Sequence, residues 1–425
     1  MIHRIFVVLH RYTGLVMALF LFIVGLTGSL LAFNTELERV FAPRLFAKPQ
    51  AGIPRLDFAT LAACAQAIVP EGRVTGVSLT EPDQAHVTFT PRSNPATGQP
   101  YILGFDAFFL DPWTGKELGR RRDGDLSQGR INIMPFLYDV HWRLAAGDLG
   151  QWILGIVAVV WSIDCFVGVY LTLPRSSGGF WRRWRYAWRV KWDATAFRVN
   201  FDLHRAGGLW VWAMLFIFAW SSVMMNIRPL YECVMSVAFS YKSPRETFVI
   251  SARPNDSPRL DWRAAQAVSA RLMAEQSHDH GFTVAEPFGL SYDPENGAYF
   301  YDVRSSRDVL QRKGGDTSVV FDGDTGQFLN LGLATGVRTG NTVESWLYAL
   351  HMARVFGRPY QVFVCLLGLV VAMLSVTGVY IWWKKRKGRI VAASRQRQAG
   401  RRGSADEPLV LRPELEGSLR QKGGI

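Results

Sequence analysis

Hydrophobic residues are concentrated in four long runs, separated by stretches in which polar residues dominate. The runs cover residues 13–33, 151–173, 206–227 and 362–383, and three of them carry no charged residue. The second run carries one, Asp164. A helix needs about 20 apolar residues to cross a hydrocarbon core about 30 Å thick. The pattern therefore predicts four transmembrane helices, arranged as a bundle.

These runs set the organisation of the whole chain. Transmembrane helices are expected over residues 1–33, 150–173, 205–227 and 359–383, with a basic loop over 174–204, long segments over 34–149 and 228–358, and a tail over 384–425. Each long segment has an alanine-rich helical stretch followed by stretches of alternating polarity, which is typical of a small α+β unit. The tail is basic and lacks periodicity, so we expect it to be disordered.

The placement of charge predicts the orientation in the membrane. The formal net charge is +13, and Lys and Arg crowd the loop 174–204 and the residues that follow the fourth run. Short loops rich in Lys and Arg stay in the cytoplasm. Both termini are therefore expected inside, and the two long segments outside. The charge is explained by orientation, so it does not indicate a nucleic-acid partner.

Several motifs occur twice in the same order, which predicts an internal duplication. LHR at residues 9–11 returns at 203–205, and RLD at 55–57 returns at 259–261. A turn containing Thr-Gly and a span ending in GVY also recur. Each copy would start in the cytoplasm and consist of a helix that crosses the membrane, the external unit, and a second helix that crosses back. Two parallel copies of this kind are related by an axis along the membrane normal.

Four of the eight histidines stand at the ends of the predicted spans. His10 and His204 precede the first and third spans, and His141 and His351 precede the second and fourth. The duplication would place each pair at one depth on facing helices. Neutral imidazole is a good iron ligand, and helix bundles build haem sites from facing side chains. We therefore expect two bis-histidine haems, held without covalent attachment because no CxxCH motif is present.

Neighbouring residues fit the same hypothesis. Gly14 follows His10 by four residues, and Gly208 follows His204 by four. A missing Cβ at these positions would make room for a flat macrocycle. Arg11 and Arg205 are expected to reach the interface and pair with haem propionates. Two haems at opposite faces would carry electrons across the bilayer.

Other polar residues leave alternatives open. Asp164 is the only acid within a span, and it could gate a proton or a quinol, or bond to a neighbouring helix. His278 and His280 form an HxH that could bind a metal or a substrate, but an exposed loop explains them as well. His3 and His86 have no counterpart in the other copy.

The chain resembles the PepSY-associated transmembrane protein family over residues 1 to about 388. The resemblance lies in LHRYTGL (9–15) and DLHRAGGL (202–209), in the paired external units with their Thr-Gly turns, and in the span ending GVYLTLPR (168–175). It implies PepSY-like external modules and an inner-membrane ferric-siderophore reductase with two b-type haems. It pairs His10 with His204 and His141 with His351.

The resemblance also bears on the reaction. It implies that electrons pass outward to a ferric siderophore, or another periplasmic Fe(III) chelate, and release ferrous iron for uptake. The chain lacks a G-x-G-x-x-G dinucleotide motif, so the donor would be a separate cytoplasmic protein or a quinol. Two alternatives remain: another periplasmic acceptor or a quinone, or a haem-free sensor whose modules bind a peptide or protease.

Overall fold

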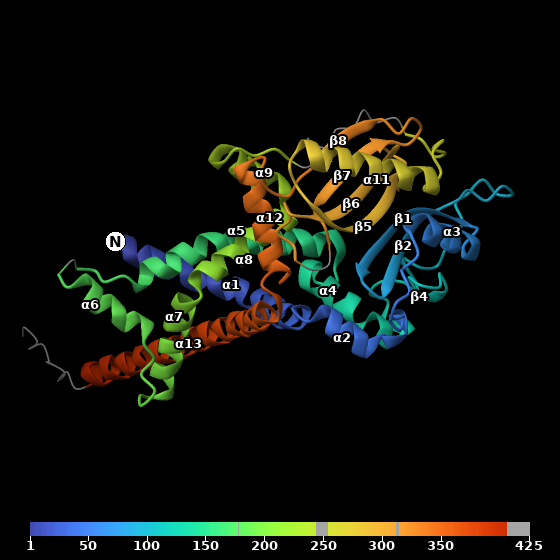
Figure 1. Cartoon of the computed structure of the whole chain (residues 1–425). Helices are drawn as coiled ribbons and strands as arrows, with labels where there is room; N and C mark the ends of the chain where they lie inside the picture. The colour runs from blue at the N-terminus through green and yellow to red at the C-terminus, as the bar shows by residue number, and fades with distance from the viewer. Residues whose placement is uncertain (177, 244–253, 312–313, 406–425) are drawn as a thin grey trace, which may run out of the picture. The chain divides into compact units, whose positions relative to one another are not determined.

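The computed structural model describes residues 1–176, 178–243, 254–311 and 314–405. The chain divides into two compact units, Met1–Gly378 and Val379–Ile425. Nearly all of the helices and all of the strands belong to the first unit (Figure 1).

Three helices are long and apolar enough to cross a membrane. They are α1 (Ile2–Leu31), α5 (Gly147–Thr172) and α13 (Gly357–Ala405). The third predicted span is two helices, α7 (Ala196–Trp210) and α8 (Trp212–Asn226), which meet at a bend of 69°. The described residues therefore contain three membrane-capable helices, or four if the bent pair counts as one span.

Shorter helices flank the spans and the sheet. They are α2 (Asn34–Phe41), α3 (Phe58–Ile68), α4 (Ile133–Arg143), α6 (Phe180–Trp184), α9 (Arg228–Ala238), α11 (Trp262–Asp279) and α12 (Thr339–His351). Helix α4 ends where Leu144 and Ala145 take positive φ values of 57° and 51°, and α12 is followed by Ala353 with φ 51°. These left-handed residues redirect the chain from α4 into α5 and from α12 into α13. Non-glycine residues adopt this region only where the surrounding fold holds them there.

The two long segments share one antiparallel sheet of eight strands, in the order β4-β3-β2-β1-β5-β6-β7-β8. The strands are β1 (Gly72–Glu81), β2 (Gln84–Pro91), β3 (Ala107–Leu110), β4 (Glu117–Arg121), β5 (Val284–Asp293), β6 (Ala298–Ser305), β7 (Thr317–Asp322) and β8 (Phe328–Gly332). The segments meet where Val77 on β1 pairs with Leu290 on β5. The expected external α+β units are thus joined edge to edge.

Helices α3 and α11 begin in the same way and pack on this sheet. Asp57 caps α3 by accepting a hydrogen bond from Thr60 N at 2.8 Å, and Asp261 caps α11 by accepting one from Ala264 N at 2.8 Å. Such caps satisfy backbone N–H groups that a helix start leaves unpaired. The helices and the sheet enclose the main core, which includes Phe108 and Phe321, both fully buried.

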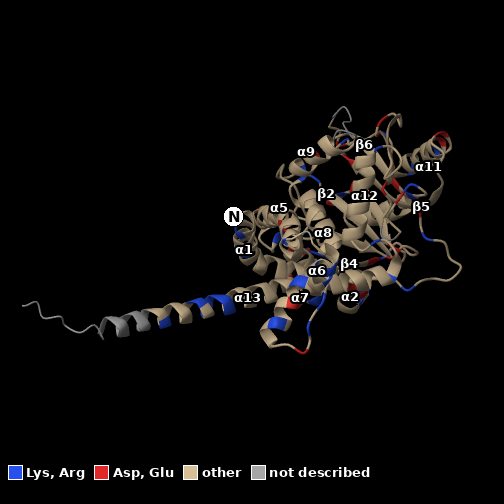
Figure 2. Cartoon of the chain, turned by 90° about the vertical axis from the view of Figure 1, so that its left-hand side faces the viewer, with Lys and Arg blue, Asp and Glu red and all other residues tan. Residues whose placement is uncertain are grey.

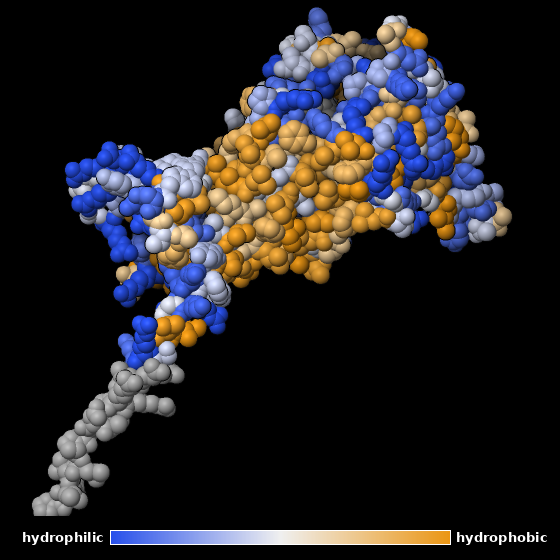
Figure 3. Space-filling view, turned by 90° about the horizontal axis from the view of Figure 1, so that it is seen from below, coloured by the Kyte–Doolittle hydropathy of each residue, from blue (hydrophilic) through white to orange (hydrophobic). Residues whose placement is uncertain are grey.

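The spans present apolar side chains outward, as a lipid environment requires. Val16, Ile163 and Leu366 are more than half exposed, at 69%, 58% and 55%. Figure 3 shows hydrophobic residues covering a broad band of one face, with hydrophilic residues at both ends of the band. Exposed apolar surface of this extent marks an interaction site, and helices of this length and composition indicate a bilayer.

Basic residues gather on particular elements. Lys and Arg mark α6, α7 and the later part of α13 (Figure 2). Helix α13 continues to Ala405, so the tail expected to be disordered from residue 384 is helical as far as that residue. Lys, Arg, Ala and Gln dominate this stretch, and all four have high helix propensity.

Candidate functional site

The structure brings the four predicted histidines together in two pairs. His10 on α1 faces His204 on α7, with ring centroids 6.1 Å apart and planes inclined by 57°. His141 near the end of α4 faces His351 at the end of α12, with centroids 6.3 Å apart and planes inclined by 65°. The pairing agrees with the one predicted from the sequence.

The spacing of both pairs suits one metal ion between the rings. A metal–imidazole bond is about 2 Å long, and the ring centre lies about 1 Å beyond the nitrogen. Two ligands on opposite sides of one ion would therefore have centroids about 6 Å apart. Both pairs have this separation, although each joins helices that are distant in the sequence.

Hydroxyl groups orient His141 and His351, which we call the outer pair. Thr27 Oγ1 lies 3.0 Å from His141 Nδ1, and Ser221 Oγ lies 2.7 Å from His351 Nδ1. Each hydroxyl has a carbonyl of its own helix in reach of its proton: Ile23 O at 2.9 Å for Thr27, and Phe218 O at 3.1 Å for Ser221. A hydroxyl that donates its proton there accepts from Nδ1–H. The Nε2 lone pair then remains for a ligand.

His10 and His204, which we call the inner pair, are held by a different set of groups. His204 Nδ1 lies 3.0 Å from Thr377 Oγ1, whose proton has Met373 O at 2.7 Å. His10 Nδ1 lies 2.9 Å from both carboxylate oxygens of Asp164 on α5. Asp164 thus bonds to a neighbouring helix, which was one of the alternatives left open by the sequence. Here too the contacts direct Nδ1–H away from the facing ring.

The two pairs lie far apart along helix α1. His10 belongs to α1, and Thr27, which contacts His141, is seventeen residues further along the same helix. At about 1.5 Å per residue this is about 25 Å. This separation is comparable to the thickness of the hydrocarbon core of a bilayer, which is about 30 Å.

A cavity of about 1110 Å³ contains the outer pair. His141 and His351 line it together with Gly28, Trp161, Leu215 and Phe218. Phe218 also stacks on the His351 ring at 4.7 Å. Small-molecule sites measure about 300–1,000 Å³ and are mostly apolar. The cavity is therefore large enough for a cofactor-sized group. His10 and His204 are not among its lining residues.

Two glycines other than Gly14 and Gly208 lie against the histidine rings. A Cβ on Gly28 would lie 2.9 Å from His141 Cε1, and one on Gly378 would lie 3.1 Å from His204 Cε1. A Cβ on Gly14 would meet nothing within 4 Å, and one on Gly208 would meet only Leu374, at 3.9 Å. Neither glycine lies against a histidine ring, and their expected role beside a macrocycle stays a prediction. The close approaches come from helices on which no histidine of that pair lies.

Arg205 is also engaged differently from the expectation. Its guanidinium pairs with buried Asp202 at 2.7 Å and donates to the carbonyls of Tyr186 and Ala187. These contacts tie the loop before α7 to the helix that carries His204. The proposed propionate contact of Arg205 would have to compete with them.

The remaining histidines lie away from both pairs. His278 is largely exposed and contacts Asp279, and His280 ends helix α11 at the surface. His86 lies on β2, where burial lowers its pKa. Among the described residues, no group of three or more His, Cys, Asp or Glu side chains could hold a bare metal ion.

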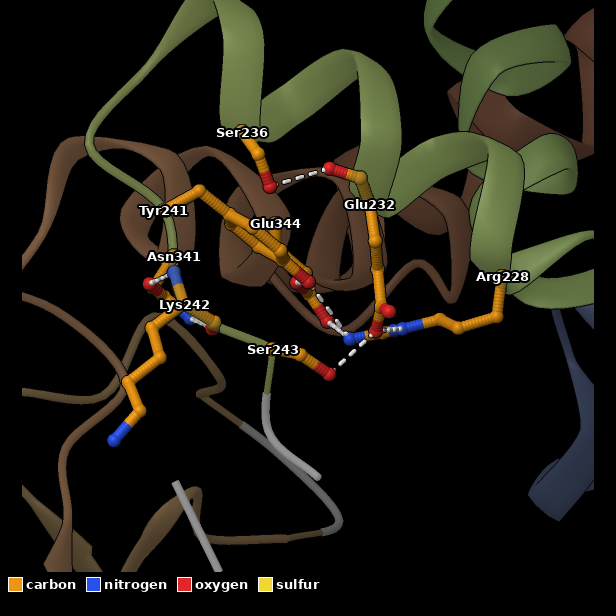
Figure 4. Close-up of polar contacts among 8 residues, drawn as sticks. All are labelled: Arg228, Glu232, Ser236, Tyr241, Lys242, Ser243, Asn341 and Glu344. Carbon is orange, nitrogen blue, oxygen red and sulfur yellow. Dashed lines mark hydrogen bonds and ion pairs between the residues drawn. The ribbon is translucent and has the colours of Figure 1, made fainter. Parts of the chain in front are cut away.

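A network of ion pairs and hydrogen bonds holds α12, which carries His351, against α9 (Figure 4). Arg228 donates to Glu344 at 2.5 Å and to Glu232 at 2.9 Å, and the Tyr241 hydroxyl donates to Glu344 at 2.8 Å. Ser243 completes it by donating to Glu232 at 2.6 Å. Arg228 and Glu344 also line the cavity. No sequence pattern predicts this network, because its members are separated by up to 116 residues.

Comparison with known proteins identifies the family. No curated protein matches the chain. The family model of the PepSY-associated TM region matches residues 7–385, which is most of the chain and includes all four paired histidines. The chain therefore belongs to the PepSY-associated transmembrane family.

Proposed function

We propose that this protein is a di-haem reductase that carries electrons across a membrane. The observation that supports it best is the geometry of the two histidine pairs, each with centroids about 6 Å apart and with Nδ1 already bonded elsewhere. A bare metal ion would find only two ligands at each pair. A porphyrin brings the other four, so haem b fits the donor set better than a free ion.

The four histidines would bind the two haems in pairs. His10 and His204 would hold the inner haem, and His141 and His351 the outer one. A haem bound in this way supplies reversible one-electron oxidation and reduction of its iron. The protein fixes the imidazole tautomers, keeps the outer site in an apolar cavity and spaces the pairs across the bilayer.

The finer architecture belongs to the same proposal. We propose a four-helix bundle in which α7 and α8 together make the third span, built from two copies of one unit. The recurring caps Asp57 and Asp261 and the four strands from each half support the duplication. The basic loop 174–204 supports an inner-membrane location with both termini in the cytoplasm.

The outer acceptor is proposed to be a periplasmic ferric siderophore or another Fe(III) chelate. The cavity with His141 and His351 is also lined by Arg121, Arg228 and Glu344, which gives it a polar part. Hard oxygen chelators hold ferrous iron less tightly than ferric iron, so one-electron reduction would release the metal. The donor would be a separate cytoplasmic protein or a quinol.

The test begins with the absorbance spectrum of the purified protein. We expect a Soret band that shifts on dithionite addition, and two haems per chain by pyridine haemochrome assay. His10→Ala or His204→Ala should remove one haem, and His141→Ala or His351→Ala the other. His278→Ala, at an exposed site, should retain both. A colourless protein would overturn the proposal and favour the haem-free sensor.

The acceptor is tested separately. The dithionite-reduced protein, freed of excess reductant, is mixed with a ferric hydroxamate or a ferric catecholate under anaerobic conditions. Reoxidation of the haems together with capture of Fe²⁺ by ferrozine would support chelate reduction. Reoxidation by a quinone analogue alone would point to the other acceptor class.

A further inference from the structure

The four paired histidines differ in the charge of the group that contacts Nδ1. His141, His204 and His351 each contact a neutral hydroxyl, from Thr27, Thr377 and Ser221 respectively. His10 contacts a carboxylate instead. The asymmetry breaks the likeness between the two sites, although their centroid separations differ by only 0.2 Å (6.1 against 6.3 Å).

The carboxylate is held firmly within the span. Both oxygens of Asp164 lie 2.9 Å from His10 Nδ1, and Thr13 Oγ1 is 3.4 Å from one of them. The Asp164 side chain is 11% exposed. No Lys or Arg of the described residues forms an ion pair with it. An acid in a transmembrane helix is costly and is retained where it has a function.

A carboxylate that accepts Nδ1–H makes the imidazole a stronger electron donor through Nε2. A stronger axial donor stabilises the ferric state more than the ferrous state. The negative charge has the same effect, because it attracts the more positive iron and is weakly screened at low dielectric. Both effects lower the reduction potential of an iron held by His10.

We propose that Asp164 lowers the reduction potential of the inner haem below that of the outer haem. Asp164 is thereby a positioning residue that sets the direction of electron transfer. One electron leaves the iron at the His10/His204 pair, which is oxidised, and reduces the iron at the His141/His351 pair, so the outward step is downhill. The inference rests on the proposed function.

The potentials of the native protein provide the first test, by optical redox titration. His141→Ala leaves the inner haem alone, and His10→Ala leaves the outer haem alone, so each midpoint can be assigned. We expect two separate midpoints, with the lower one at the His10/His204 pair. A lower midpoint at the outer pair would overturn the inference even though two haems are bound.

Substitution of the carboxylate provides the second test. Asp164→Asn keeps the shape and a hydrogen-bond acceptor but removes the charge. Its inner midpoint should rise while the outer midpoint and the haem content stay unchanged, and Asp164→Glu should retain much of the native value. A purely structural bond between α1 and α5 would leave the inner midpoint unmoved in Asp164→Asn, and that result would overturn the inference. Absence of haem from the native protein would instead overturn the proposed function.

Discussion

At the residue scale, the site depends on small groups brought in from distant parts of the chain. Thr27 and Gly28 on α1 both contact His141, one through a hydrogen bond and one through its missing Cβ. Thr377 and Gly378 on α13 have the same two relations to His204. In each histidine pair, therefore, one ring is supported by a Thr-Gly dipeptide. The threonine orients the ring, and the glycine leaves room for it.

The first prediction concerns Gly28. A valine there would force its Cβ to 2.9 Å from His141 Cε1 or displace the ring, because the position lies in a helix that cannot shift freely. We expect Gly28→Val to lose the outer haem and keep the inner one, seen as half the haemochrome absorbance. Leu19→Val is the control in the same helix, at a side chain that is 64% exposed. Equal haem content in both variants would contradict the prediction.

The second prediction concerns Asp302 on β6. Burial, together with the charges of Asp316 and Asp308, raises its pKa to about 7, from 3.8. The unfolded chain releases this proton near pH 4, whereas the folded protein keeps it until about pH 7. The contribution to stability is therefore complete below pH 4 and falls as the pH rises toward 7, by at most about 1.4 kcal/mol per pH unit.

Asp302→Asn should remove this dependence. We expect the variant to gain thermal stability over the native protein at pH 7.5 and little at pH 4.5, measured by thermal unfolding in detergent. Asp279→Asn is the control, because Asp279 is largely exposed on α11. A gain that is the same at both pH values would refute the proposed cause.

The residue scale also shows how far the sequence could lead. The four histidines and their pairing could be predicted, because the motifs recur in order and apolar runs mark depth. Gly28, Gly378 and the hydroxyls could not, because each contacts a histidine more than 100 residues away. Asp164 stood out as a lone acid, but only the fold brings it to His10.

At the element scale, short helices outside the spans position the outer site. Helices α4 and α12 carry His141 and His351, and left-handed residues separate each from the span that follows. The apolar runs gave no sign of these breaks, nor of the 69° bend between α7 and α8. Hydropathy measures how apolar a stretch is, whereas a break depends on tertiary contacts.

The third prediction tests the network that holds α12 against α9. Glu344→Gln removes the negative charge that faces Arg228. The partly buried guanidinium then keeps Glu232 as its acidic partner. We expect a loss of about 1–2 kcal/mol in stability, since breaking a partly buried pair leaves a poorly solvated charge. The outer haem should also dissociate faster, measured by transfer to apomyoglobin. Glu275→Gln, in an exposed pair, is the control. An unchanged rate of haem dissociation would show that the network does not hold His351 in place.

At the scale of the whole molecule, the sheet joins the two halves of the chain. Among the residues that the structure describes, β1 and β5 pair through Gly76–Ser78 and Gly289–Ser291, and the hydrophobic core extends across this junction. The sequence predicted α+β units in both halves, but not their union. Strand pairing between distant segments has no local signature in either segment.

The fourth prediction tests that junction by cross-linking. Val77 and Leu290 are direct partners on β1 and β5. Cysteines at both positions should form a disulfide under mild oxidation, since facing residues of neighbouring strands have Cβ atoms about 4.5–5.5 Å apart. The bond is detected by peptide mass spectrometry. Val77→Cys with Leu329→Cys, on the far strand β8, is the control and should not cross-link. Absence of the 77–290 bond would argue against the shared sheet.

The shared sheet has a consequence for biosynthesis. Gly76 on β1 can pair only after Ser291 has been synthesised, and Ser291 is 291 − 76 = 215 positions further along the chain. At a translation rate of about 5–20 residues per second, the wait is about 10–40 s. During that time the free backbone of β1 is an open template for wrong partners. A nascent chain halted before β5 is therefore expected to need a holding chaperone and to be an early target of quality-control proteases.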